Sequence, residues 1–221
     1  MASARRFDAS YREAVTLGDG TQAQLRLLRA EDKPLIVDGF ARLSTESRYM
    51  RFFGAKDHLS DDELRYLTEI DGENHFALGA VAVGADGVER GLGVARFVRL
   101  ADEPEVAELA VTVIDAAQRK GLGRILCERL MAAAHERGVR RFRAEILASN
   151  AAMLALVRGQ VAATVRRDEG TTLVIDFQVE EGAPAGEAPR PALGGLIAHL
   201  LSLAAKRLVS FRRVYDRRSS G

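Results

Sequence analysis

The chain has 221 residues, which suits one folded domain with an appended segment and is long enough to bury a sizeable core. Its 32 lysines and arginines nearly balance its 31 aspartates and glutamates, so no global basic field points to a nucleic-acid partner. The single cysteine, Cys127, excludes an intramolecular disulfide framework, and the first residues contain no apolar stretch of a secretory signal. We therefore expect a cytoplasmic protein.

The first third of the chain predicts a hairpin followed by three helices. Alternating apolar residues on either side of an Asp-Gly turn predict the hairpin, with strands at 15–17 and 22–28. Ser60 and Glu63 have the spacing of a capping box, which marks the start of a helix. The three helices are expected to begin at Asp32, Thr45 and Ser60, and the last should run to about Ile70.

Strands and helices alternate over the following hundred residues. The expected strands are 75–83, 91–100, 106–114, 141–147, 161–167 and 171–179, and the expected helices are 121–136 and 150–158. Gly138 follows the first of these helices at the position where glycine commonly ends a helix. This order predicts an α/β domain over residues 1–179.

The most informative stretch runs from Val111 to Arg124. It ends an apolar strand, makes a short polar turn and enters an amphipathic helix through Gly121 and Gly123. The N-terminus of a helix carries unsatisfied N–H groups and partial positive charge, so it favours an anion. Glycines remove the Cβ atoms that would keep a phosphate away. Three basic residues add side-chain charge there: Arg119, Lys120 and Arg124. We interpret this turn as a cradle for a diphosphate.

The glycine pair also has other interpretations. A strand-to-helix turn can carry glycines for its geometry alone. A Walker loop requires Lys and Ser or Thr after its second glycine, whereas Arg124 and Ile125 follow Gly123. The dinucleotide-binding fingerprint requires a third glycine at the position of Leu126. These two nucleotide-binding motifs are therefore excluded.

The run Gln118-Arg119-Lys120-Gly121-Leu122-Gly123, which follows the strand residues 108–113, resembles the acyl-CoA motif of the GNAT superfamily of N-acetyltransferases. The resemblance extends over roughly residues 15–179. It implies a mixed, twisted sheet with splayed central strands and helices on both faces. It also implies acetyl-CoA as acyl donor, with its diphosphate on the loop and its pantetheine arm along the preceding strand.

The resemblance also implies a set of cofactor-binding residues and a general base. The cofactor-binding residues are Val111, Val113, Gln118, Arg119, Lys120, Gly121, Leu122, Gly123, Arg124, Asn150 and Met153. Asn150 is equally suited to cap a helix. Neutralising a lysine side chain at pH 7 requires about 4.6 kcal/mol, so a carboxylate near the thioester assists the transfer. Glu108 matches the family's general base, and Glu105 and Glu145 are the alternatives. The tyrosine that many members use as general acid is absent from residues 150–160, so that role stays unassigned.

Residues 43–53 and 59–64 resemble the bacterial protein lysine acetyltransferases that modify acyl-CoA synthetases. This resemblance implies transfer of an acetyl group to a primary amine, with a protein lysine as one candidate. A polyamine, an amino acid or an aminoglycoside remains open as acceptor. The alternative function is a catalytically silent acyl-CoA-binding sensor that acts through the C-terminal segment.

The last forty residues differ in character from the domain. Residues 180–191 are rich in Pro and Gly and predict a linker. Residues 192–221 predict a basic amphipathic helix, too short in its uncharged part to span a bilayer. Such a helix would dock on its own domain or a twin subunit, or bind a membrane surface or a partner protein.

The remaining histidines and arginines suggest no further chemistry. The four histidines lack ligand spacing, so we expect no metal site. Four arginines are expected to form a solvated edge, with assistance to a CoA 3′-phosphate as the alternative: Arg137, Arg140, Arg141 and Arg143.

Overall fold

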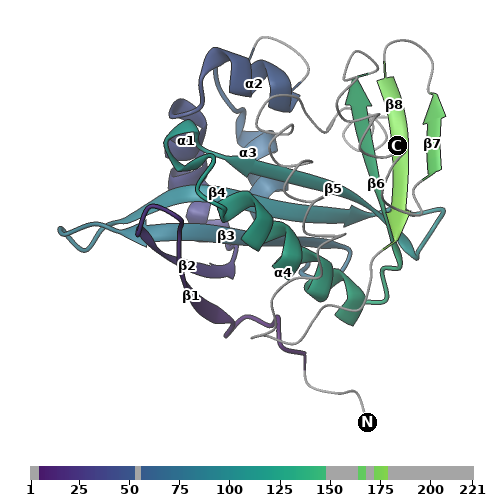
Figure 1. The fold of residues 1–221 in the computed structure, drawn as a ribbon, viewed down its shortest axis with the longest axis horizontal. Helices are drawn as coiled ribbons and strands as arrows, with labels where there is room; N and C mark the ends of the chain where they lie inside the picture. The colour runs from purple at the N-terminus through teal and green to yellow at the C-terminus, as the bar shows by residue number, and fades with distance from the viewer. Residues whose placement is uncertain (1–4, 53–55, 148–163, 168–171, 179–221) are drawn as a thin grey trace.

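The computed structural model describes residues 5–52, 56–147, 164–167 and 172–178 (Figure 1). They form one eight-stranded sheet in the order β1-β2-β3-β4-β5-β6-β8-β7. The strands are β1 (Arg12–Thr16), β2 (Gln22–Leu27), β3 (His75–Val83), β4 (Glu89–Arg99), β5 (Val106–Val113), β6 (Arg141–Leu147), β7 (Thr164–Arg167) and β8 (Thr172–Gln178). Of the neighbouring pairs, β5 and β6 are parallel and the others are antiparallel, so the sheet is mixed.

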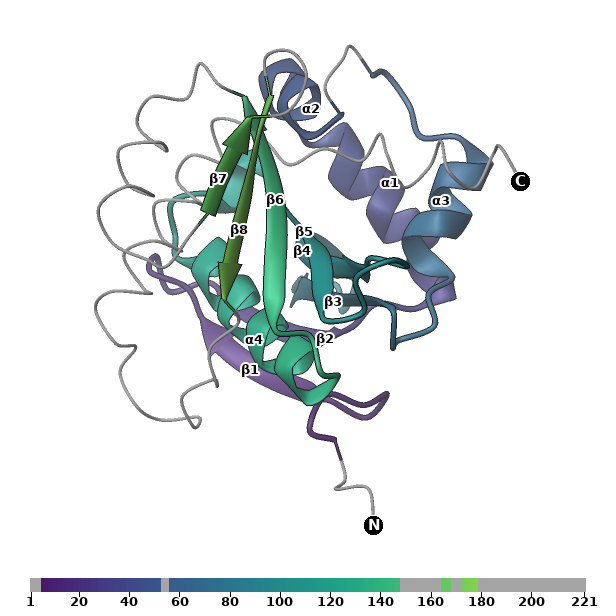
Figure 2. The same ribbon diagram turned by 90° about the vertical axis from the view of Figure 1, so that its right-hand side faces the viewer.

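Helices cover both faces of the sheet, as Figures 1 and 2 show. The α-helices are α1 (Lys33–Ala41), α2 (Thr45–Phe52), α3 (Asp61–Thr68) and α4 (Leu122–Glu136), and two short 3-10 helices are η1 (Ala30–Asp32) and η2 (Asp115–Ala117). The long helix α4 packs against β3, β4 and β5 on one face, and α1 packs against β4 on the other. The main core lies under α4, where Leu126 and Leu130 are fully buried beside Phe76 and Phe97.

The two central strands separate after a short common stretch. β5 pairs with β4 from Ala107 to Val113, but it pairs with β6 only over Val106, Ala107 and Glu108. Meanwhile β6 stays paired with β8 along its whole length, so it turns away from β5 (Figure 1). This divergence confirms the expected splayed central strands. It leaves the β6-facing edge of β5 without a strand partner beyond Glu108, among the residues described.

Local signals in the sequence place most element boundaries. Ser60 caps α3, since its hydroxyl accepts from the Glu63 N–H at 3.3 Å and its own N–H donates to the Glu63 carboxylate at 2.8 Å. Gly138 follows α4 with φ of 75°, as expected for a glycine that ends a helix. The third helix ends at Thr68 rather than Ile70, and β4 begins at Glu89 rather than Gly91.

Several expectations fall on the chain outside the described residues. They are the helix at 150–158, the linker at 180–191 and the amphipathic helix at 192–221. Within the described part, no helix has the length and apolar character needed to cross a membrane.

Candidate functional site

The turn between β5 and α4 has the backbone geometry of an anion site. Gly121 adopts a left-handed conformation with φ of 84° immediately before the helical Leu122. Successive residues of opposite hand turn their N–H groups toward one point, which forms a concave anion-binding nest. The Ile125 N–H donates to the Gly121 carbonyl at 3.2 Å, so the N–H groups of Leu122, Gly123 and Arg124 precede the first hydrogen bond of the helix. With the helix dipole, this arrangement favours a bound phosphate.

Two polar residues before the glycine shape this turn. Arg119 is exposed and has a positive φ of 60°, which a residue with a Cβ adopts at a cost on the order of 1–3 kcal/mol. Gln118 donates from its side-chain amide to the Val113 carbonyl at 3.1 Å, which closes the turn. Gln118 therefore stabilises the conformation of the loop. The strained backbone of Arg119 lies in the loop where the sequence motif predicts a bound diphosphate.

The β1–β2 turn contacts the same loop through a backbone hydrogen bond and an ion pair. The Gly18 N–H donates to the Lys120 carbonyl at 2.9 Å, and the Lys120 ammonium lies 2.7 Å from the Asp19 carboxylate. The hydrogen bond from Lys120 holds the pKa of Asp19 well below its usual range. Arg124 lies 3.7 Å from Glu128 one turn along the helix. Among the described residues, Arg119 is thus the cation of this loop that has no ion pair.

Asp115 connects the loop to α2. Its carboxylate accepts from the Ser44 N–H, the Ser44 hydroxyl and the Ser47 hydroxyl, each at 2.9 Å. Burial by itself would raise the pKa of Asp115, but these hydrogen bonds outweigh burial and lower it. Because Arg51 near the end of α2 also donates to the Thr112 hydroxyl at 2.9 Å, α2 is fastened to both β5 and the loop that follows it.

The side chains of β5 alternate between the two faces of the sheet. Leu109, Val111 and Val113 pack against the core beneath α4, whereas Ala110 and Thr112 line a cavity on the α1 side. Because these side chains are in the core, the predicted contacts of Val111 and Val113 with the pantetheine arm would be made by their backbone atoms, along the edge of β5 that faces β6. Glu108 is half-buried and sits at the last parallel pair, opposite Arg143, about 17 Å along the strand from Val113. Glu108 and the cradle thus lie at the two ends of the splayed part of β5.

The arginine next to Glu108 in the sheet is engaged in ion pairs. Arg143 contacts the Asp176 carboxylate at 2.8 Å and the Glu103 carboxylate at 2.7 Å. The expectation that Arg143 belongs to a solvated edge is therefore wrong. Arg141 reaches Glu103 at 3.5 Å, and Arg140 is exposed.

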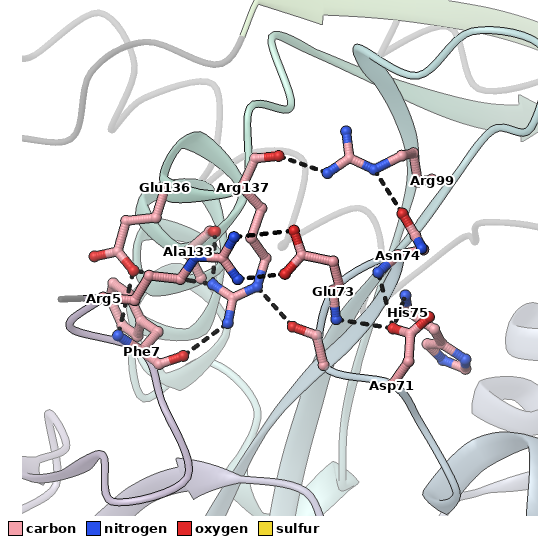
Figure 3. A network of polar contacts seen from close by, with 11 residues as sticks. Arg5, Phe7, Asp71, Glu73, Asn74, His75, Arg99, Ala133, Glu136 and Arg137 are labelled. Carbon is pink, nitrogen blue, oxygen red and sulfur yellow. Dashed lines mark hydrogen bonds and ion pairs between the residues drawn. The ribbon is translucent and has the colours of Figure 1, made fainter. Parts of the chain in front are cut away.

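Arg137 also departs from the expected solvated edge (Figure 3). Its guanidinium is buried at the C-terminal end of α4 and donates to the carbonyl oxygens of Phe7, Gly72 and Ala133 at 2.7, 2.7 and 3.0 Å. Phe7 and Gly72 are 130 and 65 residues away in the sequence, so a row of arginines alone could not predict these contacts. The role of Arg137 is to join the N-terminal segment and the α3–β3 loop to the helix.

The buried arginines that sequence reasoning missed include Arg51 and Arg96, and it also missed the loop anchor Asp115. No local spacing marks them, because their contacts join segments far apart in the sequence. Asn150 and Met153 lie outside the described residues, as does the side chain of Glu145. Glu105 is exposed before β5 begins. Within the described part, no three His, Cys, Asp or Glu side chains come together as metal ligands.

Comparisons with known proteins agree with this geometry. A family profile described as acetyltransferase (GNAT) domain matches residues 23–159, more than half of the chain. Acetyltransferase Pat of Mycolicibacterium smegmatis is 33% identical over 159 residues, which cover 72% of this chain and 46% of that protein. The chain thus spans about half the length of this curated relative.

Solved structures show the same fold. The GNAT domain of S. lividans PAT has a TM-score of 0.65 and 29% identity, covering 78% of this chain and 99% of that domain. The putative acetyltransferase yncA of Salmonella typhimurium, solved with its cofactor acetyl-CoA, has a TM-score of 0.52 and 23% identity, covering 76% of this chain and 98% of that one. The chain belongs to the GNAT family of acetyltransferase domains.

Proposed function

We propose that this chain transfers an acetyl group from acetyl-CoA to a primary amine. The observation that carries the proposal is the open edge of β5, which runs from Glu108 to the anion cradle at Gly121. An extended ligand arm can pair with this edge as an added strand while its diphosphate meets the helix N-terminus. Family membership and the acetyl-CoA in the yncA structure support the choice of donor.

In this proposal the cradle binds and orients the donor. The N–H groups of Leu122, Gly123 and Arg124 donate to the diphosphate, and Arg119 adds charge from the exposed side. The backbone of Val111 and Val113 pairs with the pantetheine arm. Gln118 stabilises the loop conformation. Lys120 adds positive charge for the diphosphate once its ion pair with Asp19 opens. Asn150 and Met153 remain proposed contacts of the same arm.

Glu108 is the proposed general base. It accepts a proton from the substrate ammonium, directly or through one water, and the neutral amine then attacks the thioester carbonyl carbon. A backbone N–H of β5 near Leu109 to Val111 donates to the oxyanion of the tetrahedral intermediate. The C–S bond then breaks, the electron pair leaves with the CoA sulfur, and the attacking nitrogen gives its extra proton to the thiolate, so that the amide and the free CoA thiol are formed. The position of Glu108 where β5 and β6 part supports this role.

The proposed acceptor is a protein lysine, as on an acyl-CoA synthetase, and the proposed compartment is the cytoplasm. Similarity to Pat and to S. lividans PAT supports a protein amine as the acceptor. Contact with a second copy or a protein partner through residues 192–221 belongs to the same proposal. A silent acyl-CoA sensor would bind the donor and show no transfer to any amine.

The test is an assay of acetyl transfer to lysine peptides, proteins and small amines, in which the release of CoA is measured. Glu108→Gln should lower the rate about 10²- to 10⁴-fold at pH 7 and leave acetyl-CoA affinity unchanged. The deficit should shrink as pH approaches 10, because the amine is then already neutral. Glu105→Gln, at an exposed position three residues earlier, serves as the control. A Glu108→Gln enzyme with the wild-type rate at every pH would exclude Glu108 as the base.

A further inference from the structure

A cavity with a volume of about 90 Å³ lies between the sheet and helices α1 to α3. One water molecule needs roughly 10–15 Å³, so the cavity has room for a small organic group. Its walls are mainly apolar side chains: Leu35, Ile36, Phe40, Leu43, Phe52 and Leu67. Ala110 and Thr112 of β5 also face it, so the cavity adjoins the strand that forms the candidate site.

Two of the arginines that line this cavity have very different surroundings. Arg26 is buried, but it contacts both oxygens of Asp32 at 2.7 Å and the Glu89 carboxylate at 2.7 Å. Arg96 is only 3% exposed, and it donates to the Leu67 carbonyl at 3.1 Å and lies 3.0 Å from His75 Nε2. Among the described residues, Arg96 therefore contacts a backbone carbonyl and an imidazole ring but no carboxylate.

A second buried cation reinforces the charge around Arg96. Arg51 of α2 lines the same cavity, is 8% exposed, and donates from Nε to the neutral hydroxyl of Thr112. Burial lowers the pKa of Arg96 to about 9, and the charge of Arg51 contributes to this shift. Burial lowers the pKa of Arg51 to about 10. Arg96 is therefore still charged at neutral pH, which is costly in an apolar cavity.

We propose that this cavity binds a small organic acid, whose carboxylate pairs with Arg96 and Arg51. A carboxylate accepts charge-assisted hydrogen bonds from guanidinium groups in a planar geometry. The short apolar chain of the acid lies against Phe40 and Leu43. An inorganic phosphate would leave oxygens against these apolar walls, so the lining favours an organic acid. This proposal does not depend on acetyl transfer, because the cavity lining includes neither Glu108 nor the residues of the cradle.

The test uses butyrate, with butyramide as a neutral analogue of nearly the same shape. Binding to the full chain is measured by calorimetry and by the thermal unfolding midpoint, at constant ionic strength set with sodium chloride. Butyrate should raise the midpoint in a concentration-dependent way, and butyramide should leave it unchanged. Equal effects of the two compounds, or no effect of butyrate, would overturn the proposal.

Variants then place the binding in the cavity. Arg96→Met should weaken butyrate binding at least tenfold, and affinity is compared in the folded variant because the Leu67 carbonyl also loses its donor. Arg51→Gln provides a second, smaller change with the same expected loss of affinity. Arg90→Met, at an exposed position near the start of β4, removes one positive charge elsewhere and should bind butyrate as the wild type does. Wild-type affinity in both cavity variants would refute the assignment.

Discussion

At the C-terminal end of α4, the Arg137 guanidinium donates to three carbonyl oxygens from three segments of the chain (Figure 3). At the N-terminal end, the N–H groups of Leu122, Gly123 and Arg124 precede the first hydrogen bond of the helix. The preceding loop also holds Arg119 in a strained conformation and exposes it. One end of the helix is therefore saturated with internal contacts, and the other has N–H groups without acceptors in the helix.

This difference separates residues that maintain the fold from residues that can bind a ligand. A buried polar group that is fully paired stabilises the structure and has little capacity left for a ligand. Donors that converge on an open site without internal acceptors favour an incoming anion. Substitutions at the C-terminal end of α4 should thus change mainly the stability of the fold. Substitutions at its N-terminal end should change mainly the affinity for acetyl-CoA.

The largest effect is expected at the saturated end. Arg137→Met should lower the free energy of unfolding by about 3–5 kcal/mol, because it leaves buried carbonyl oxygens without donors. Arg140→Met, three residues along at an exposed position, should change it by less than about 0.5 kcal/mol. Denaturant unfolding measures both. Folded Arg137→Met protein should still bind acetyl-CoA normally, and a large loss of affinity would break the separation of roles.

The two glycines with positive φ at the ends of α4 offer a matched pair. Gly121 and Gly138 have φ of 84° and 75°, and a Cβ on either would meet open space. Valine at either position should lower stability by a similar 1–3 kcal/mol. Gly121→Val should also weaken acetyl-CoA binding about 30- to 100-fold, whereas Gly138→Val should not weaken it. Equal binding by both variants, measured by calorimetry, would show that the turn is not a cradle.

A smaller effect is expected at the strained residue of the loop. Arg119→Gly removes the strain of a φ of 60° and should raise the free energy of unfolding by about 1 kcal/mol. The same change removes a charge and should weaken acetyl-CoA binding up to about tenfold. Denaturant unfolding of this variant measures the change in stability, and calorimetric titration measures the change in acetyl-CoA affinity. A less stable variant with unchanged affinity would contradict both assignments.

The smallest effect is expected at the ion pair behind the loop. Asp19→Asn keeps an oxygen for the Thr21 N–H but releases Lys120 from its carboxylate partner. The freed ammonium should tighten acetyl-CoA binding about two- to fivefold, since exposed ion pairs are weak. The gain should diminish as salt screens the charges. Weaker binding in this variant would mean that Asp19 serves to position Lys120 for the ligand.

Much of the fold could be predicted because its signals are local. The capping box at Ser60, the Asp-Gly turn at residues 19–20 and the alternation along β5 each fix a nearby element. The splay of β5 and β6 came from the family resemblance and not from periodicity. The splay depends on the residue at which the two strands stop pairing, and the sequence of one strand alone does not determine that residue.

The candidate site was predictable in part for the same reason. Gly121 and Gly123 mark the cradle within one short motif, whereas the buried arginines depend on distant partners. The acceptors of Arg96 are 29 and 21 residues away, and two carbonyl acceptors of Arg137 are 65 and 130 residues away. A charged residue in a strand or at a helix end normally indicates a solvated position. Only the tertiary arrangement shows that these arginines are buried.

The most direct test is a pair of calorimetric titrations of the full chain, one with acetyl-CoA and one with S-acetylpantetheine. The second compound keeps the thioester and the extended arm but lacks the diphosphate. If the N-terminal end of α4 binds the diphosphate, acetyl-CoA should bind with micromolar affinity, and S-acetylpantetheine at least about 100-fold more weakly. Equal affinities, or no binding of acetyl-CoA, would contradict the assignment of this turn as the cradle.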